Sequence, residues 1–213
     1  MNFSVKYIKI QNNQSIKQLN EKDEGEKEER CIKDIYNYGE LKVLVKGFFL
    51  LDNNIKKLYG YLKSHHKDVN VVIVNSNIVF GLEHIFGILR IIHTEMKIGK
   101  KGEIKNFEIE FLLRICYTDQ ISNAFKILND NKNHNFICIL FSNCVSSIEN
   151  TYNQLKNFGI ENSDLIQTSG AKKLHILQVF FKKDLAYLNN QFIKDDQKFQ
   201  QFLIERSAIA VNK

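Results

Sequence analysis

The sequence predicts an α/β (α+β) fold: a single domain in which helices flank a mixed central β-sheet. Short stretches rich in β-branched and aromatic residues alternate along the chain with longer stretches whose apolar residues recur at helical spacing. Hydrophobic residues make up 44% of the 213 residues, an ordinary fraction for a globular protein. The chain can therefore build a core between a sheet and the helices packed on it.

Four stretches are predicted to be strands. The clearest has the sequence FICILFS, whose continuous run of apolar residues is typical of a strand covered on both faces. The others are rich in the β-branched and aromatic residues that favour strands. The predicted strands are 41–50, 69–75, 136–142 and 173–181.

Six further stretches carry apolar residues at intervals of three or four, which predicts helices. The predicted helices are 53–65, 76–95, 107–116, 120–128, 146–159 and one within the tail 194–213. The tail leaves room for a short strand at its end.

Capping residues set the expected ends of these helices. Ser76 or Asn77 is expected to cap the second helix, Asn106 the third and Asp119 the fourth. Gly159 is expected to end the fifth helix as its C-terminal cap.

Two helices contain residues that bear on their packing. In the fourth, the residues expected to face inward are Ile121, Ala124, Phe125 and Leu128. In the second, Gly81 and Gly87 each cost about 1 kcal/mol in a helix interior. Either the backbone packs closely at these glycines, or the helix has other boundaries.

The chain is predicted to consist of an N-terminal strand or tail over 1–35 and one domain over 36–213. Residues 11–30 form a low-complexity polar insertion, whose last ten residues hold six acids and three bases. Such a segment buries too little apolar area to offset the entropy lost on ordering, so we expect it to be disordered.

Composition limits the classes of function. The net charge of +6 is compatible with a polyanionic partner such as RNA without requiring one. The four cysteines show no metal-ligand spacing, and Cys116 and Cys138 are expected to be buried thiols of a protein in a reducing compartment. Neither a signal peptide nor a membrane-spanning run is visible, so we expect an intracellular, soluble protein.

Motifs that carry catalytic chemistry are not visible in the sequence. Neither GxxxxGK[ST] nor GxGxxG after a strand occurs, and the stretch GKKG at 99–102 is read as a solvated loop. His84 and His93 are nine residues apart in one predicted helix, so they cannot form an i, i+4 metal pair. We therefore predict no metal site, no cofactor and no catalytic residues, and favour a binding protein over an enzyme.

Three ordered blocks of sequence carry a family resemblance. They read NSNIVFGLEHI at 75–85, EIEFLLRICYTDQISNAF at 108–125 and IERSAIA at 204–210. The chain resembles, over roughly 41–211, the TPRKB family, the small kinase-binding subunit of the KEOPS (EKC) complex. The residues that match the family pattern are His84, Glu110, Leu112, Arg114, Gln120, Ile121, Ala124, Arg206 and Ala208.

The resemblance implies a non-catalytic, regulatory subunit in the cytoplasm and nucleus, with no membrane partner. It would bind the small atypical kinase/ATPase of the KEOPS complex, and through that kinase would act indirectly on the threonylcarbamoyl transferase subunit. It would also help to bind tRNA at its 3′ CCA end during synthesis of threonylcarbamoyladenosine in tRNA. The elbow CYTDQ would then belong to a surface and not to an active site.

The resemblance also assigns candidate site residues. The kinase interface is expected at Leu203, Ile204 and Ile209, although these apolar residues could equally pack inward. The residues expected to contact tRNA are His84, Arg90, Lys97, Lys100, Lys101, Lys105, Arg114 and Gln120. Two of these have structural alternatives, because Arg114 can pair with Glu110 one turn earlier and His84 can be a buried histidine.

Two other classes of function stay open. A stand-alone RNA-binding α/β module would bind RNA without a kinase partner, with steep salt dependence. An enzyme on this fold would need a concave pocket with convergent polar groups.

Overall fold

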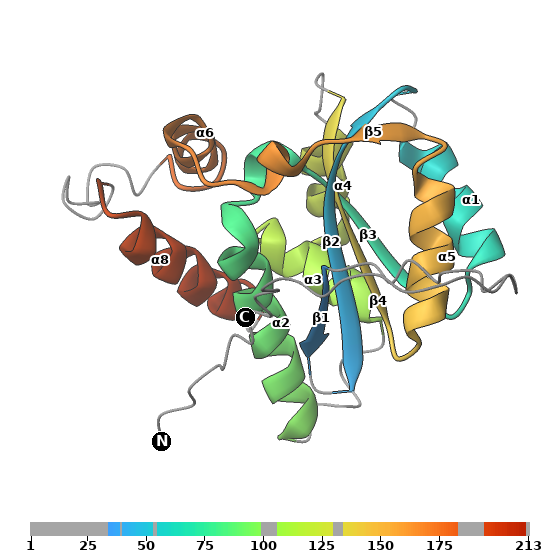
Figure 1. Ribbon diagram of the computed structural model, residues 1–213. Coiled ribbons are helices and arrows are strands. Elements are labelled where there is room, and N and C mark those ends of the chain that lie inside the picture. The colour runs from blue at the N-terminus through green and yellow to red at the C-terminus, as the bar shows by residue number, and fades with distance from the viewer. Residues whose placement is uncertain are drawn as a thin grey trace, which may run out of the picture. The chain divides into compact units, whose positions relative to one another are not determined.

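The computed structural model contains a five-stranded antiparallel sheet with helices on both faces (Figure 1). It describes residues 34–38, 40–52, 55–98, 106–129, 134–182 and 194–211. The strands are β1 (Ile35–Tyr38), β2 (Leu41–Leu50), β3 (Asn70–Asn75), β4 (Asn135–Ser142) and β5 (Gly159–Glu161). Their order is β1-β2-β4-β3, and β5 pairs with β2.

The predicted α/β fold is confirmed, but the described part of the sheet is antiparallel in every pair and not mixed. Strands β2 and β3 both run antiparallel to β4, so they point in the same direction. They do not pair, because β4 lies between them. The helical crossover from β2 to β3 therefore creates no parallel ladder.

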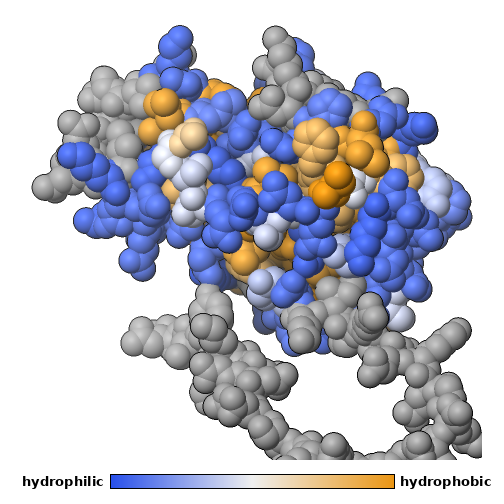
Figure 2. Space-filling model, turned by 45° about the horizontal axis from the view of Figure 1, so that its top comes forward, coloured by the Kyte–Doolittle hydropathy of each residue, from blue (hydrophilic) through white to orange (hydrophobic). Residues whose placement is uncertain are grey.

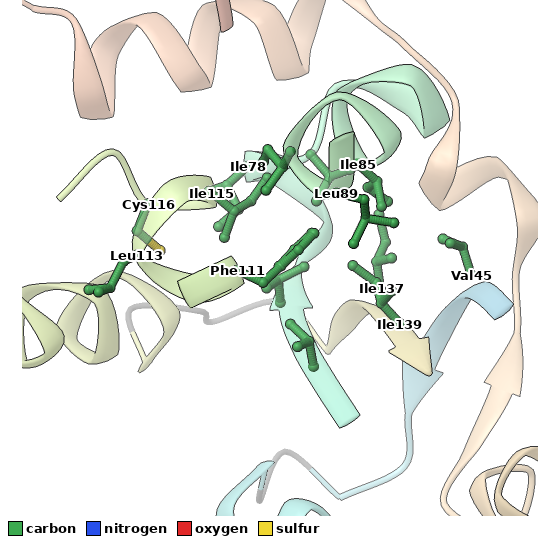
Figure 3. Close-up of a cluster of buried hydrophobic side chains, with 14 of the residues drawn as sticks. Val45, Ile78, Ile85, Leu89, Phe111, Leu113, Ile115, Cys116, Ile137 and Ile139 are labelled. Carbon is green, nitrogen blue, oxygen red and sulfur yellow. The ribbon is translucent and has the colours of Figure 1, made fainter. Parts of the chain in front are cut away.

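Two groups of helices cover the two faces of the sheet. Helices α1 (Ile55–His65) and α5 (Val145–Leu155) lie on one face, and α2 (Gly81–Lys97), α3 (Phe107–Ile115) and α4 (Ile121–Asn129) lie on the other (Figure 1). Every residue of β4 from Phe136 to Ser142 is buried, as predicted for a strand covered on both faces. Figure 3 shows Ile137 and Ile139 of this strand beside Leu89 and Phe111 in the core.

A third apolar cluster lies beyond the sheet. It joins α6 (Gly170–Phe180) and α8 (Asp196–Ile209) to the residue before α2. Its buried members are Phe80, Ile176, Leu177, Phe181, Phe199, Phe202 and Leu203. Since Phe80 immediately precedes α2, this cluster fixes α8 against the start of that helix.

The predicted strand 173–181 is wrong, because residues 173–180 belong to α6 and Phe181 is its C-terminal cap. The run is apolar like a strand, yet its buried residues recur at helical spacing: Ile176, Leu177 and Phe181 are buried, and Leu174 and Val179 are exposed. Ser169 caps the helix by accepting a hydrogen bond from the Lys172 N–H at 3.2 Å.

The start of α2 also differs from the prediction. Residues 76–78 form a separate 3₁₀ turn, η1 (Ser76–Ile78), capped by the Asn75 side chain and not by Ser76 or Asn77. Gly81 begins α2 with φ +83°, a left-handed conformation that favours glycine. Its place in the sequence thus marks the helix boundary.

Several smaller predictions about ends and faces are wrong. Helix α4 begins at Ile121, so Gln120 and not Asp119 precedes it, and both Ile121 and Phe125 are exposed. Gly159 starts β5 instead of capping α5, which ends at Leu155. The described end of the chain is a turn after α8, without the short strand considered there.

Other predictions are confirmed. Helices α1, α3, α5 and α8 and strands β2, β3 and β4 lie where expected, and the Asn106 side chain caps α3 through the Ile109 N–H at 3.1 Å. Cys116 and Cys138 are buried free thiols. The insertion at 11–30 lies outside the described residues.

Candidate functional site

The elbow after α3 is turned by Tyr117. This residue has φ +50°, and it is the one non-glycine residue with positive φ in the described part of the chain. Its N–H donates to the Arg114 carbonyl at 3.2 Å, and the Thr118 N–H donates to the Leu113 carbonyl at 3.1 Å. These bonds form a Schellman motif, whose left-handed residue is usually glycine. A tyrosine there costs about 1–2 kcal/mol, so its side chain must contribute contacts that a glycine would lack.

The Tyr117 side chain reaches the interior of the α2 side. Its hydroxyl oxygen lies 2.9 Å from Nε2 of His84, and the two rings are nearly parallel, with centroids 6.2 Å apart. Its ring also packs edge-on against Phe180 and Phe181, at 4.9 Å between centroids in each case. Tyr117 therefore connects the elbow to α2 and α6.

His84 is fully buried and takes part in two hydrogen bonds. The Phe80 N–H points at Nδ1 at 3.2 Å, and a backbone N–H can only donate, so Nδ1 accepts. The ring proton is then on Nε2, which donates to the Tyr117 oxygen. Burial lowers the pKa of His84 to about 3, so its imidazole is neutral at physiological pH.

The polar chain continues into α8. Tyr117 is hydrogen-bonded to the Ser207 side chain, and burial raises the pKa of Tyr117 well above its ordinary value. The Ser207 hydroxyl donates to the Leu203 carbonyl at 2.9 Å. Polar contacts thus connect α2, the elbow and α8.

Arg114 makes the second polar link between these helices. Its guanidinium is fully buried and donates from Nε to Glu110 at 2.7 Å and from Nη2 to Glu95 at 2.7 Å. Its Nη1 donates to the Ser207 carbonyl at 3.1 Å. The pairing with Glu110, predicted as the structural alternative for Arg114, is therefore present. The contacts with Glu95 and Ser207 also connect α3 to α2 and to α8.

A glycine allows α8 to lie close to α2. A Cβ atom on Gly87 would lie 2.4 Å from Cγ1 and Cδ1 of Ile204, closer than real Cβ contacts occur. Of the two predicted explanations for the helix glycines, close packing holds for Gly87 and a shifted boundary holds for Gly81. The residues that make these links, His84, Gly87, Arg114, Tyr117, Ile204 and Ser207, are called the three-helix junction below.

The residues predicted for the kinase interface differ in accessibility. Leu203 is fully buried in the cluster of α6 and α8, so it is a core residue. Ile204 is half-buried against Gly87. Ile209, near the end of α8, has 55% of its surface exposed and is the accessible member of the three.

The residues predicted for tRNA contact also differ in accessibility. His84 and Arg114 are buried and already paired, so neither presents its polar atoms to a ligand in this structure. Arg90 and Lys97 are exposed on α2, and Gln120 is exposed at the elbow. The residues Lys100, Lys101 and Lys105 lie outside the described residues.

Other kinds of site have little support among the described residues. No group of three His, Cys, Asp or Glu side chains there is placed to hold a metal ion. None of the described helices is both long and apolar enough to cross a membrane. A shallow apolar hollow between α3 and α4 is lined by Ile109, Leu112, Leu113, Ile121, Ala124 and Phe125.

Sequence reasoning singled out the elbow but not the residues that matter most in it. The left-handed backbone conformation of Tyr117 was not predicted, since a tyrosine gives no local signal of that conformation. Ser207 and Glu95 were also missed, because both meet Arg114 only through tertiary packing.

Comparisons of the chain with models of known protein families and with curated proteins gave no match.

The buried His84 predicts a pH dependence of stability. The folded protein keeps this imidazole neutral down to about pH 3, whereas the unfolded chain protonates near its ordinary value of 6.5. The unfolded state binds the extra proton between these values, so stability falls as pH falls, by up to about 1.4 kcal/mol per pH unit.

Urea unfolding of the wild type and His84→Gln at pH 7, 6, 5 and 4 measures this dependence. The difference in free energy of unfolding between the two proteins should shrink as the pH falls. Parallel pH profiles for the two proteins would show that His84 is not held neutral by the fold.

Proposed function

We propose that this protein is a non-catalytic subunit of a KEOPS-type complex, which binds the small atypical kinase/ATPase and helps to bind tRNA during threonylcarbamoyladenosine synthesis. One observation carries the proposal. The three sequence blocks that resemble the TPRKB family are far apart in the chain, yet they meet at the three-helix junction through His84, Tyr117, Arg114 and Ser207. Of these four residues, His84 and Arg114 match the family pattern, whereas Tyr117 and Ser207 lie within the blocks without matching it. Blocks that converge on one structural unit support a shared architecture better than scattered blocks would.

The junction suits a protein that presents a rigid helix to a partner. Arg114 and Tyr117 bind α8 from its inner side, where both contact Ser207. The outer side of α8 exposes Gln201, Glu205 and Ile209, which follow each other at intervals of four residues. A preorganised helix loses little entropy on binding, so this face is our candidate for the kinase contact, with Ile209 as its apolar anchor.

For tRNA, we propose a contact on the exposed side of α2. Arg90 and Lys97 are seven residues apart, so they lie on one side of the helix. Cations of this kind attract phosphates without reading sequence. The buried His84 and Arg114 would then support the surface from inside, without touching RNA.

The double substitution Arg90→Ala/Lys97→Ala tests this contact. Without these two cations, tRNA binding should weaken. The slope of log affinity against log salt concentration should become shallower by about 0.7–0.9 for each phosphate that is no longer neutralised. Fluorescence anisotropy with labelled tRNA at several salt concentrations gives both values. Lys56→Ala/Lys67→Ala removes the same charge from exposed positions elsewhere and is the matched control. Equal effects of the two double variants would indicate attraction by net charge alone.

The partner is tested by purifying the tagged protein from its own cells and identifying what comes with it by mass spectrometry. The proposal expects a small kinase together with the threonylcarbamoyl transferase. Recovery of RNA without a kinase would favour the stand-alone RNA-binding module instead.

A further inference from the structure

The two edges of the sheet end in different ways. At the β3 edge, the buried Glu108 carboxylate accepts a hydrogen bond from the Val71 N–H at 2.5 Å. It also accepts from Tyr59 and Lys63, both at 2.9 Å. A side chain from α3 therefore occupies a backbone donor of β3, which protects this edge from pairing with another strand.

The other edge includes β5, which pairs with residues 48–50 of β2. Hydrogen bonds on either side of β5 show which way its backbone groups point. The Phe158 carbonyl accepts from the Leu51 N–H at 3.0 Å, and the Asn162 N–H donates to the Gly47 carbonyl at 2.8 Å. The even-numbered residues of this stretch thus direct their backbone groups toward β2. Because these directions alternate along a strand, the odd-numbered residues of β5 direct theirs outward.

Gly159 and Glu161 are therefore the residues that present backbone groups at the outer side of β5. In the described part of the chain, no strand pairs with that side. The Glu161 carboxylate already has partners, because Lys46 contacts it at 2.9 Å and the Tyr152 hydroxyl donates to it. The charge of Glu161 is thus balanced within its own chain.

Apolar side chains lie beside the same edge. Ile160 of β5 and Phe49 of β2 are directly opposite each other in the ladder, with 62% and 44% of their surfaces exposed. Figure 2 shows apolar residues gathered on the face that Figure 1 places over β5 and the end of β2. An open backbone edge with an apolar margin is the kind of surface to which another strand adds.

We propose that this edge pairs with a second copy of the chain, so that two copies of β5 lie antiparallel about a two-fold axis at Ile160. Gly159 of one copy then lies opposite Glu161 of the partner subunit, and the two residues exchange backbone hydrogen bonds through their outward N–H and C=O groups. The sheets of the two copies become one continuous sheet. Dimerisation at this edge does not depend on the proposed function.

The sequence of β5 suits pairing with itself in this register. Glu161 lies opposite a glycine, so no like charges are opposed there. Ile160 meets the same residue of the second copy at the closely spaced, non-hydrogen-bonded position, which extends the apolar row that begins at Phe49. An axis at Glu161 would instead place two carboxylates opposite each other, which is destabilising.

Sedimentation velocity of the full chain between about 1 μM and about 1 mM tests the proposal, since a ladder of three residues predicts weak association. The wild type should pass from monomer to dimer within this range. Ile160→Asp should weaken the dimer at least about tenfold, because two carboxylates would be opposed at the axis. Leu174→Asp is the matched control and should dimerise like the wild type, since Leu174 lies on α6 and is exposed to a similar extent, 56%.

A mixture of Ile160→Asp and Ile160→Lys tests the position of the axis. Opposite charges would then face each other, so the mixture should associate at least about tenfold more tightly than either variant alone. A strand of a different protein on this edge would not produce such a rescue. Circular dichroism of each variant checks that the domain remains folded.

Three results would overturn the proposal. The first is a wild type that stays monomeric throughout the concentration range. The second is a dimer of Ile160→Asp that is as tight as that of the wild type. The third is a mixture of the two charged variants that associates no more tightly than each variant alone.

Discussion

Replacing Arg114 with methionine is expected to lower the free energy of unfolding by about 3–5 kcal/mol. Methionine has a similar length but removes the guanidinium that pairs with Glu95 and Glu110 and binds the Ser207 carbonyl. The two carboxylates would remain close together and mostly buried, and removing one partner of a buried ion pair is strongly destabilising. Urea unfolding followed by circular dichroism measures the change.

Neutralising the carboxylates should restore part of the stability. The triple variant Arg114→Met/Glu95→Gln/Glu110→Gln keeps the shape of the site but removes the two carboxylate charges that Arg114 neutralises, so it should be more stable than Arg114→Met alone. Arg90→Met, on the exposed side of α2, is the matched control and should change stability by less than about 0.5 kcal/mol. If Arg114→Met were as mild as this control, Arg114 would not hold the three-helix junction together.

The second large effect is expected at Ile209. Glutamate in place of this exposed isoleucine should leave the fold intact and reduce recovery of the kinase at least tenfold, because a charge would be desolvated at the centre of the proposed interface. Quantitative mass spectrometry of the purified complexes measures the recovery. Leu174→Glu on α6 is the control, since Leu174 is exposed to 56% and Ile209 to 55%.

The burial of Leu203 determines which substitutions can test the interface. Glutamate at Leu203 would place a charge in the cluster of Phe80 and Phe199, so any drop in kinase recovery would report unfolding. Ile204 has a similar drawback, because it packs on Gly87. Equal kinase recovery with Ile209→Glu and Leu174→Glu would place the partner elsewhere on the molecule.

Local sequence predicted the elements whose environment is uniform along their length. The apolar run of β4 and the helical spacing in α1 are each repeated over several residues, so a single misplaced residue does not change the interpretation. Strands β1 and β5 have four and three residues, too few to show a period, and both form only because β2 offers its edge. In α6, the continuous apolar run led to the prediction of a strand, although the buried residues recur at helical spacing.

The candidate site was predictable only where its contacts are local. The pair Glu110 and Arg114 is one helical turn apart, and the sequence alone predicts that contact. Arg114 is separated along the chain from Glu95 by 19 residues and from Ser207 by 93 residues, and helical spacing predicts no contact over such separations. Tyr117 adopts the conformation of a glycine because its hydroxyl joins His84 and Ser207, which is known only once the helices are packed.

The most direct test of the proposed function is the amount of threonylcarbamoyladenosine in tRNA from cells depleted of this protein, measured by mass spectrometry of digested nucleosides. We expect the amount of the modified nucleoside to fall on depletion, to return with the wild-type protein and not to return with Ile209→Glu. An unchanged level of threonylcarbamoyladenosine in cells that lack the protein would contradict the proposed function.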